Sequence, residues 1–334
     1  MKKIIAMILA LVMALSLAAC GSAAPAETEA AAPEATAETF KVAIIQQLDH
    51  SSLDEIRNAI ETQLKALAAE KGVAIEISYD NGQNDTSMLT QIATQVVSDE
   101  PDMIIPIATL AAQYAVLAAE NTDIPIVYAA ISDPGGAGLT GLPTVTGVSD
   151  ALNTPFILDM MLAAQPDVKT VGLLYSTSEI NSLTPIAQAK EYLDAKGIAY
   201  IEKTGTTSGE ITEAAASLVG RVEAVFTPTD NAVMAAEASV AELLNAGGIA
   251  HYTGADSFVQ SGAFTTCGVN YTELGTKSAD IAFDILMGGE IGEFVVMDGG
   301  IITVNTDTAA AIGVDYEIFN TMANTVNAVT TVVD

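Results

Sequence analysis

The sequence predicts an α/β protein built from two lobes of similar topology, each with a parallel sheet. Two observations predict this fold. From Lys41 onward, apolar runs typical of strands alternate with helical patterns, the order expected of parallel βαβ units. The same order recurs after residue 170, and equivalent elements lie about 125 residues apart, a domain-sized period.

The strands and helices follow one another in the same order in both copies. In the first copy, strands are expected at 42–47, 73–79 and 102–108, with helices near 54–70 and 86–98. In the second copy, strands are expected at 171–175, 198–203 and 224–228, with a helix near 184–195 and another before the last strand. Each copy also contains a helix end, a Lys-Gly pair and a following strand, in LAAEKGVAIE and LDAKGIAYIE. The architecture is therefore expected twice.

The first twenty residues have the pattern of a secretion signal that ends at a cysteine. Lys2 and Lys3 precede an apolar run over 4–15, which is too short for a permanent membrane-spanning helix, and small residues precede Cys20. The segment resembles the lipobox of bacterial lipoproteins, which implies a diacylglycerol on Cys20 as the first mature residue. A plain cleaved signal peptide is the alternative.

The stretch that follows Cys20 contains no large apolar residue and cannot bury a core. We expect a signal peptide at 1–19 and a lipidated cysteine with a disordered tether at 20–39.

Removing the signal peptide removes two lysines and no acid, so the mature chain has 42 acidic and 10 basic side chains. Nucleic acid and anionic membrane patches are poor partners for such a charge. Cys267 is then the only other cysteine, which excludes a disulfide framework.

Six loops follow the expected strands and are rich in hydroxyls, amides and carboxylates. In open parallel sheets, ligands bind beyond the carboxyl ends of the strands, so these loops are the candidate site. They begin near Leu48, Thr109, Ile131, Ser176, Pro228 and Gly254. Several run into a helix, whose free backbone N–H groups favour an anionic group. Simple helix capping by Ser, Thr and Asp is the alternative explanation.

Eight pieces of the sequence carry a resemblance to a known family. In order, they are HSSLDEIRNAI, PIATLAAQ, AAISDPGGAGL, VTGVSD, GLLYSTSEINS, FTPTDN, GADSFVQSGAF and GVNYTELG. From about Lys41 to the C-terminus the chain resembles the ABC-transporter substrate-binding lipoproteins of the tryptophan/tyrosine type. The resemblance implies a type I periplasmic binding protein fold, with two Rossmann-like lobes joined by three crossovers. We place the crossovers near Asp150, Val269 and Gly299, so that the N-terminal lobe comprises 40–150 plus 269–298 and the C-terminal lobe comprises 151–268 plus 299–334.

An α-amino acid needs an anion pocket and a cation pocket close together. The expected anion pocket is formed by Thr109, the N–H groups of Leu110 and Ala111, and Ser132. Asp230, with Asp256, is expected to bind the ammonium group from the other lobe, so that the ligand bridges the lobes and stabilises closure.

Five further residues complete the expected ligand site. His50 and Ser51 are expected in the cleft, and Tyr175, Ser178 and Asn181 are expected along its wall.

Other chemistries have weaker support in the sequence. The run GAGLTG beginning at Gly136 satisfies G-x-G-x-x-G, but β-branched residues follow it where a nucleotide site needs a helix. The chain has two histidines, His50 and His251, and neither has a metal-ligand spacing, so we expect no cofactor and no metal. His50 beside Ser51 leaves a hydrolase as an alternative, although adjacent residues rarely face each other productively.

The resulting hypothesis is an extracytoplasmic, membrane-anchored, monomeric protein that is not an enzyme. It captures a small solute, expected to be an amino acid with an aromatic or large apolar side chain, and delivers it to an ABC permease and its ATPase. A nucleoside or sugar ligand and a sensor that signals to a membrane receptor are the alternatives.

Overall fold

The computed structural model describes residues 38–332. The expected signal peptide, the lipidation of Cys20 and nearly all of the tether lie outside the described residues. Within residues 38–332, no helix combines the length and the apolar composition that crossing a membrane requires.

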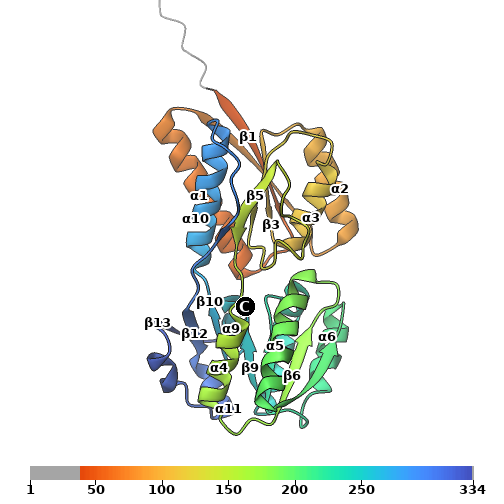
Figure 1. Cartoon of the computed structure of the whole chain (residues 1–334), viewed down its shortest axis with the longest axis vertical. Coiled ribbons are helices and arrows are strands. Elements are labelled where there is room, and N and C mark those ends of the chain that lie inside the picture. The colour runs from red at the N-terminus through yellow and green to blue at the C-terminus, as the bar shows by residue number, and fades with distance from the viewer. Residues whose placement is uncertain (1–37, 333–334) are drawn as a thin grey trace, which may run out of the picture. The chain divides into compact units, whose positions relative to one another are not determined.

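The first sheet has six parallel strands in the order β11-β5-β4-β3-β1-β2 (Figure 1). The strands are β1 (Thr39–Gln46), β2 (Ala74–Asn81), β3 (Met103–Ile107), β4 (Ile126–Ala129), β5 (Val145–Ser149) and β11 (Val295–Val296). Its helices are α1 (Ser51–Lys71), α2 (Thr86–Ser98), α3 (Thr109–Ala118) and α10 (Tyr271–Leu286). Successive residues of a strand point to opposite faces. Accordingly, Val42 and Ile44 pack with α1 and α10, whereas Ala43 and Ile45 pack with α2 and α3.

The second sheet has seven strands in the order β13-β12-β10-β9-β8-β6-β7. The strands are β6 (Thr170–Tyr175), β7 (Ala199–Thr204), β8 (Ala224–Thr227), β9 (Ala250–Thr253), β10 (Thr265–Gly268), β12 (Ile301–Asn305) and β13 (Thr325–Val329). The helices are α4 (Thr154–Ala164), α5 (Leu183–Lys196), α6 (Ser208–Ala216), α7 (Asn231–Met234), α8 (Glu237–Ala246), α9 (Asp256–Gln260) and α11 (Thr306–Ile312), with short 3₁₀ turns at Ile180–Ser182 and Glu317–Thr321. All pairings are parallel except that of β12 with β10, which the sequence did not predict.

The predicted internal repeat is confirmed by the topology. The order β2-β1-β3-β4-β5 in one sheet matches β7-β6-β8-β9-β10 in the other. The two Lys-Gly pairs end equivalent helices, because Gly72 after α1 and Gly197 after α5 both adopt the left-handed conformation, with φ of 71° and 70°. The predicted α/β class with two mostly parallel sheets is therefore correct.

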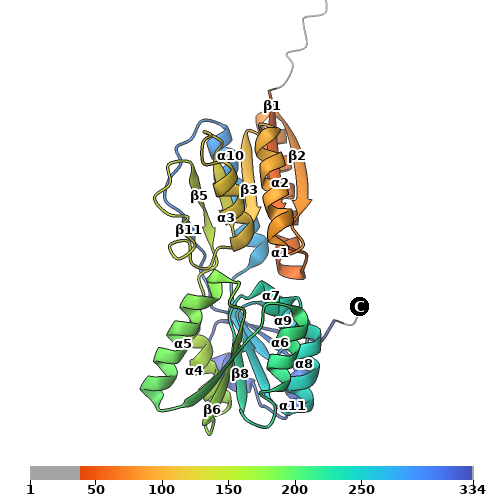
Figure 2. The same cartoon turned by 90° about the vertical axis from the view of Figure 1, so that its right-hand side faces the viewer.

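The chain passes between the sheets three times, after β5, after β10 and after β11. Figure 2 shows the first sheet in the upper half of the picture and the second sheet in the lower half, with the connecting segments between them. The lobe boundaries near Asp150, Val269 and Gly299 stay a prediction. The carboxyl ends of β1, β3 and β4 in one sheet and of β6, β8 and β9 in the other are followed by the loops that carry the candidate site.

Candidate functional site

Side chains of the two lobes contact each other across the space between the sheets. Gln47 Nε2 donates to Glu179 Oε1 at 2.8 Å, and Ser52 Oγ donates to Asp256 Oδ1 at 2.9 Å. Further cross-lobe pairs are Ser132 Oγ with Thr229 Oγ1 at 2.8 Å, His50 Nε2 with Asn231 Oδ1 at 3.3 Å, and Thr184 Oγ1 with Asp133 Oδ2 at 2.6 Å. One apolar cluster also contains residues of both lobes, among them Leu53 and Phe258. The structure therefore has its lobes in contact.

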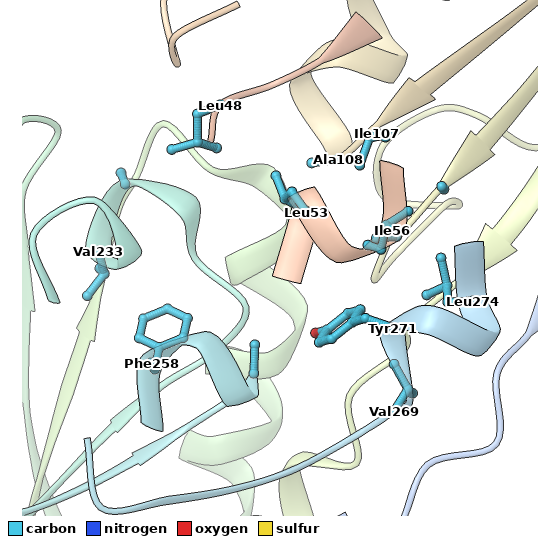
Figure 3. Packing of buried hydrophobic residues seen from close by; sticks show 14 of the residues in the cluster. Leu48, Leu53, Ile56, Ile107, Ala108, Val233, Phe258, Val269, Tyr271 and Leu274 are labelled. Carbon is cyan, nitrogen blue, oxygen red and sulfur yellow. The ribbon is translucent and has the colours of Figure 1, made fainter. Parts of the chain in front are cut away.

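These contacts surround a cavity of about 30 Å³ between the lobes. Leu53, Met234, Phe258 and Tyr271 form its apolar part. Figure 3 shows Leu53 from α1, Phe258 from α9 and Tyr271 from the start of α10 around a common space. Its polar lining residues are His50, Ser52, Thr109, Ser132, Asp150, Asn181, Thr229, Asp230 and Asn231.

Asp150 brings a carboxyl group into this cavity directly after β5. Its Oδ1 accepts a hydrogen bond from Ser132 Oγ at 2.9 Å, and only 6% of the residue is exposed. Burial raises the pKa of Asp150 to about 6, although the hydrogen bond from Ser132 opposes this shift. The shift is large because none of the lining residues is a lysine or an arginine. A ligand that carries a positive charge would supply the missing partner.

Two buried polar atoms without protein partners accompany this carboxyl group. Asn181 Nδ2 donates to the Thr229 carbonyl at 2.7 Å, which leaves Asn181 Oδ1 buried without a protein partner. His50 contacts Asn231 through Nε2, and its Nδ1 is likewise buried without a protein partner. Burial lowers the pKa of His50 to about 4, against the opposing effects of Asn231, Asp54 and Asp49, so the imidazole is neutral at physiological pH. Buried polar atoms are normally hydrogen-bonded, so both atoms point to a ligand.

The backbone is strained at two positions that line the cavity. Ala108 at the end of β3 has φ of 72°, and Ala130 at the end of β4 has φ of 58°. Residues with a Cβ rarely adopt positive φ, and such strain is concentrated at functional sites. Sequence patterns gave no sign of this strain, because both residues are alanines in apolar runs.

The structure brings five of the predicted site residues to the cavity: His50, Thr109, Ser132, Asn181 and Asp230. The other six do not line it. Ser51 and Ser178 are exposed, and Ala111 is buried within α3. The N–H of Leu110 donates to Gln47 Oε1 at 2.9 Å, so that N–H is engaged by the protein itself.

The remaining two residues also have protein partners. Tyr175 donates to Glu202 Oε2 at 3.0 Å on the neighbouring strand β7. Asp256 accepts the cross-lobe hydrogen bond from Ser52. The assignment of these residues to a ligand stays a prediction, and their present contacts do not favour it.

Asp230 lines the cavity, but its own lobe satisfies both of its oxygens. Oδ1 accepts from the Val233 N–H at 2.9 Å and so caps α7, the role expected of a simple N-cap. Oδ2 accepts from the Ser176 N–H at 2.7 Å and from Ser182 Oγ at 2.6 Å. The carboxylate is therefore held by three donors without any ligand.

Sequence reasoning missed several residues that the structure places at the site. Gln47, Ser52, Asp150, Thr229, Asn231, Phe258 and Tyr271 either line the cavity or join the lobes. The sequence did contain a signal for Asp150, because this carboxylate directly follows a buried strand, β5. Asp230 follows the end of β8 at a similar position, and it was predicted for that reason. The others depend on side-chain directions that a strand pattern does not specify.

Comparison with known proteins agrees with this geometry. Residues 41–324 match the family model described as ABC transporter substrate binding protein. A tyrosine-binding protein from Clostridioides difficile (strain R20291) is 33% identical over 278 residues, which cover 81% of this chain and 80% of that protein.

Two solved structures give information on the arrangement of the lobes. An ABC domain in complex with L-Trp from Streptococcus pneumonia is 28% identical, with a TM-score of 0.80 over 86% of this chain and 100% of that chain. A ligand-free, open substrate-binding protein from Clostridium difficile is 32% identical, with a TM-score of 0.66 over 88% of this chain and 100% of that chain. The lower score despite the higher identity indicates that the lobes here are arranged more as in the tryptophan complex than as in the open structure.

Proposed function

Because this chain belongs to the family of ABC transporter substrate-binding proteins, we propose that the solute it captures is an amino acid with an aromatic side chain. Members of this family act outside the cytoplasm and deliver a small solute to the transporter. The ligand is expected between the lobes, where closure would surround it.

The observation that carries this proposal is the carboxyl group of Asp150 in a cavity lined by no lysine or arginine. A buried carboxylate is stable only with a charge partner or several donors. An α-ammonium group supplies both a positive charge and three N–H donors. The donors that do not bind Asp150 need acceptors of their own, and Asn181 Oδ1 in the same cavity has no protein partner. We therefore assign the ammonium site to Asp150, and we retain Asp230 mainly as a cap.

The apolar part of the cavity supports an aromatic side chain. Phe258 and Tyr271 offer rings, and Leu53 and Met234 offer flexible aliphatic surface. The tyrosine-binding relative and the tryptophan-bound structure support the same ligand class. A volume of about 30 Å³ holds on the order of two water molecules. An amino acid would therefore require the lobes to move apart from their present positions.

The ligand class can be tested by measuring the melting temperature of the protein with a panel of solutes. Binding to the folded state raises the melting temperature as the ligand concentration passes the dissociation constant. We expect shifts with tyrosine or tryptophan, smaller shifts with leucine, and none with nucleosides or sugars. Shifts with nucleosides or sugars alone would reject the amino-acid proposal. Calorimetric titration of the responding solutes then gives their affinities.

We also propose that the protein is a monomer anchored to the cell membrane through a lipid on Cys20, with the residues between Cys20 and the start of β1 as the tether. Two acyl chains hold a protein on a membrane stably, whereas one gives reversible binding.

The contact of His50 supports a role in the ligand site and not a catalytic one. Its Nε2 faces Asn231 Oδ1 in the other lobe, whereas Ser51 is exposed at the start of α1. A natural amino acid that is consumed during incubation would contradict this reading.

A further inference from the structure

A chain of hydrogen bonds runs from the backbone of α3 to Nε2 of His50, whose other ring nitrogen, Nδ1, has no protein partner. It passes through Gln47 at the end of β1, Glu179 after β6, and Asn231 at the start of α7. Gln47, Glu179 and Asn231 are all buried, with exposed fractions of 0%, 0% and 8%. The chain crosses between the lobes twice and ends at the ligand cavity.

The direction of this chain is fixed at its first member. The N–H of Leu110 is a donor, so the atom of Gln47 that faces it at 2.9 Å must be the amide oxygen. The amide nitrogen of Gln47 therefore faces Glu179 Oε1 at 2.8 Å and donates to it. A second N–H of the same amide donates to Asn84 Oδ1 at 2.8 Å. Glu179 Oε1 must then always act as an acceptor.

Any proton on Glu179 is consequently confined to Oε2, which faces Asn231. When Glu179 is ionised, Asn231 Nδ2 donates to Oε2 at 3.1 Å and Asn231 Oδ1 accepts from His50 Nε2. When Oε2 carries a proton, that O–H donates to Asn231, whose amide must rotate so that its oxygen accepts. The nitrogen of Asn231 then faces His50 and donates to Nε2.

We propose that Glu179 is a positioning residue that sets the hydrogen-bonding polarity of His50 toward the ligand. With Glu179 ionised, the imidazole proton is on Nε2, and Nδ1 accepts a hydrogen bond from the ligand. With Glu179 protonated, the imidazole proton is on Nδ1, which donates to the ligand. The ring stays neutral in both states, so the switch takes up one proton, on Glu179, and moves one within the imidazole by exchange with water.

The surroundings make Glu179 the member that takes up this proton. Burial, followed by the negative charge of Asp230, raises the pKa of Glu179 to about 8, against the opposing effect of hydrogen bonds from Asn231, Gln47 and Asn181. Asp230 is held by three donors within its lobe, which favours its ionised form over that of Glu179. Asp49 and Asp54 are the charged groups that act on His50, and burial outweighs both of them.

The test is ¹⁵N NMR of the ligand-free full chain labelled at histidine, which contains only His50 and His251. As pH falls through about 8, His50 Nδ1 should change from unprotonated to protonated, and the ring should stay neutral until about pH 4. His251 is the internal control. It contacts Glu237 and Thr227 within its own lobe, so its signals report folding and should not follow the change at His50.

The substitution Glu179→Gln imitates the protonated acid permanently. Gln47 would still require an acceptor, so the new amide must turn its nitrogen toward Asn231 and hold His50 in the form with a proton on Nδ1 at every pH above about 4. A tautomer that is the same in the wild type at all pH values, or a pH response that persists in this variant, would overturn the proposal.

A second variant keeps the proposal testable if Glu179→Gln does not fold. Asn231→Leu is similar in size and breaks the chain between Glu179 and His50, so the tautomer of His50 should no longer respond to pH near 8. A response retained in Asn231→Leu would also overturn the proposal. The inference rests on the proposed function only in placing a ligand against His50. Because the NMR is done without ligand, failure of the aromatic amino-acid assignment and failure of the hydrogen-bond chain give different results.

Discussion

Replacing Asp150 with asparagine should lower ligand affinity and raise the stability of the ligand-free protein. Asparagine has the same shape as aspartate and can still accept the hydrogen bond from Ser132, but it carries no charge. If Asp150 binds an ammonium group, the variant leaves that group buried without a charge partner. Loss of one partner from a desolvated pair costs about 2–5 kcal/mol, which is roughly thirty-fold or more in dissociation constant.

The effect on stability follows from the pKa of Asp150. The folded state raises this pKa from 3.8 to about 6, so the folded protein binds the proton more tightly than the unfolded chain does. The unfolding free energy therefore falls as pH rises through this interval, by about 3 kcal/mol at about 1.4 kcal/mol per pKa unit. Asparagine removes this penalty. Without ligand, we expect Asp150→Asn to be more stable than the wild type above pH 6 and equally stable or less stable below pH 3.8.

Calorimetric titration with tyrosine and tryptophan measures the affinity, and denaturant unfolding without ligand measures the stability. Asp80→Asn is a suitable control, since Asp80 is an exposed aspartate on β2 and its replacement changes the net charge equally. Wild-type affinity in Asp150→Asn would remove Asp150 from the ammonium site. A loss of stability at neutral pH would show that its carboxylate is better compensated than its burial indicates.

Three further predictions concern pH, packing and the anchor. Ligand affinity should fall about tenfold per pH unit below the pKa of Asp150, at about 6, because the ammonium group needs the ionised carboxylate. Affinity that stays constant between pH 6 and pH 4 would argue against the ionised form as the ligand partner. Gly147→Ala should lose about 1–3 kcal/mol or more of unfolding free energy, because the new methyl group collides with the carbonyl oxygen and ring of Tyr128. In Gly209→Ala, in α6, the new methyl group has no atom within 4 Å, so this variant should gain about 0.5–1 kcal/mol. Equal unfolding curves for the two variants would contradict this packing. Cys20→Ala should abolish incorporation of labelled fatty acid in cells, and label retained by that variant would reject lipidation there.

Most of the fold could be predicted from the sequence because periodic burial determines it. Helix α2 begins and ends where its pattern does, at Thr86 and Ser98. The parallel pairing within each repeat follows from its βαβ pattern, and the equal order of the strands in the two sheets follows from the repeat itself. The antiparallel pairing of β12 with β10 could not be predicted in this way. It depends on the direction in which the chain re-enters the second lobe after its last crossing, and a short apolar strand carries no signal for that direction.

The site was only partly predictable, because sequence specifies which loops meet but not which side chains fill the space between them. His50, Ser132 and Asn181 were found because polar residues after strands must gather at one edge of each sheet. Phe258 and Tyr271 were missed because the direction of each side chain depends on how its helix packs in the folded protein. Phe258 lies within the short helix α9, and Tyr271 is the first residue of α10. Gln47 was missed for a similar reason, since its role requires Glu179 of the other lobe.

The comparison of Asp230 with Asp150 shows why two strand-end carboxylates have different expected roles. Asp230 precedes a helix by one residue, so the free N–H groups of α7 and the nearby serines hold its charge inside one lobe. Asp150 instead lies where the chain leaves β5 toward the other lobe, and the helix that follows, α4, is capped by Asn153. It therefore gains the hydroxyl of Ser132 but no helix N-terminus, and its charge remains undercompensated in the absence of ligand. A carboxylate that the protein leaves undercompensated gives the ammonium group of a ligand a differential affinity for the closed state, and this difference is what drives closure.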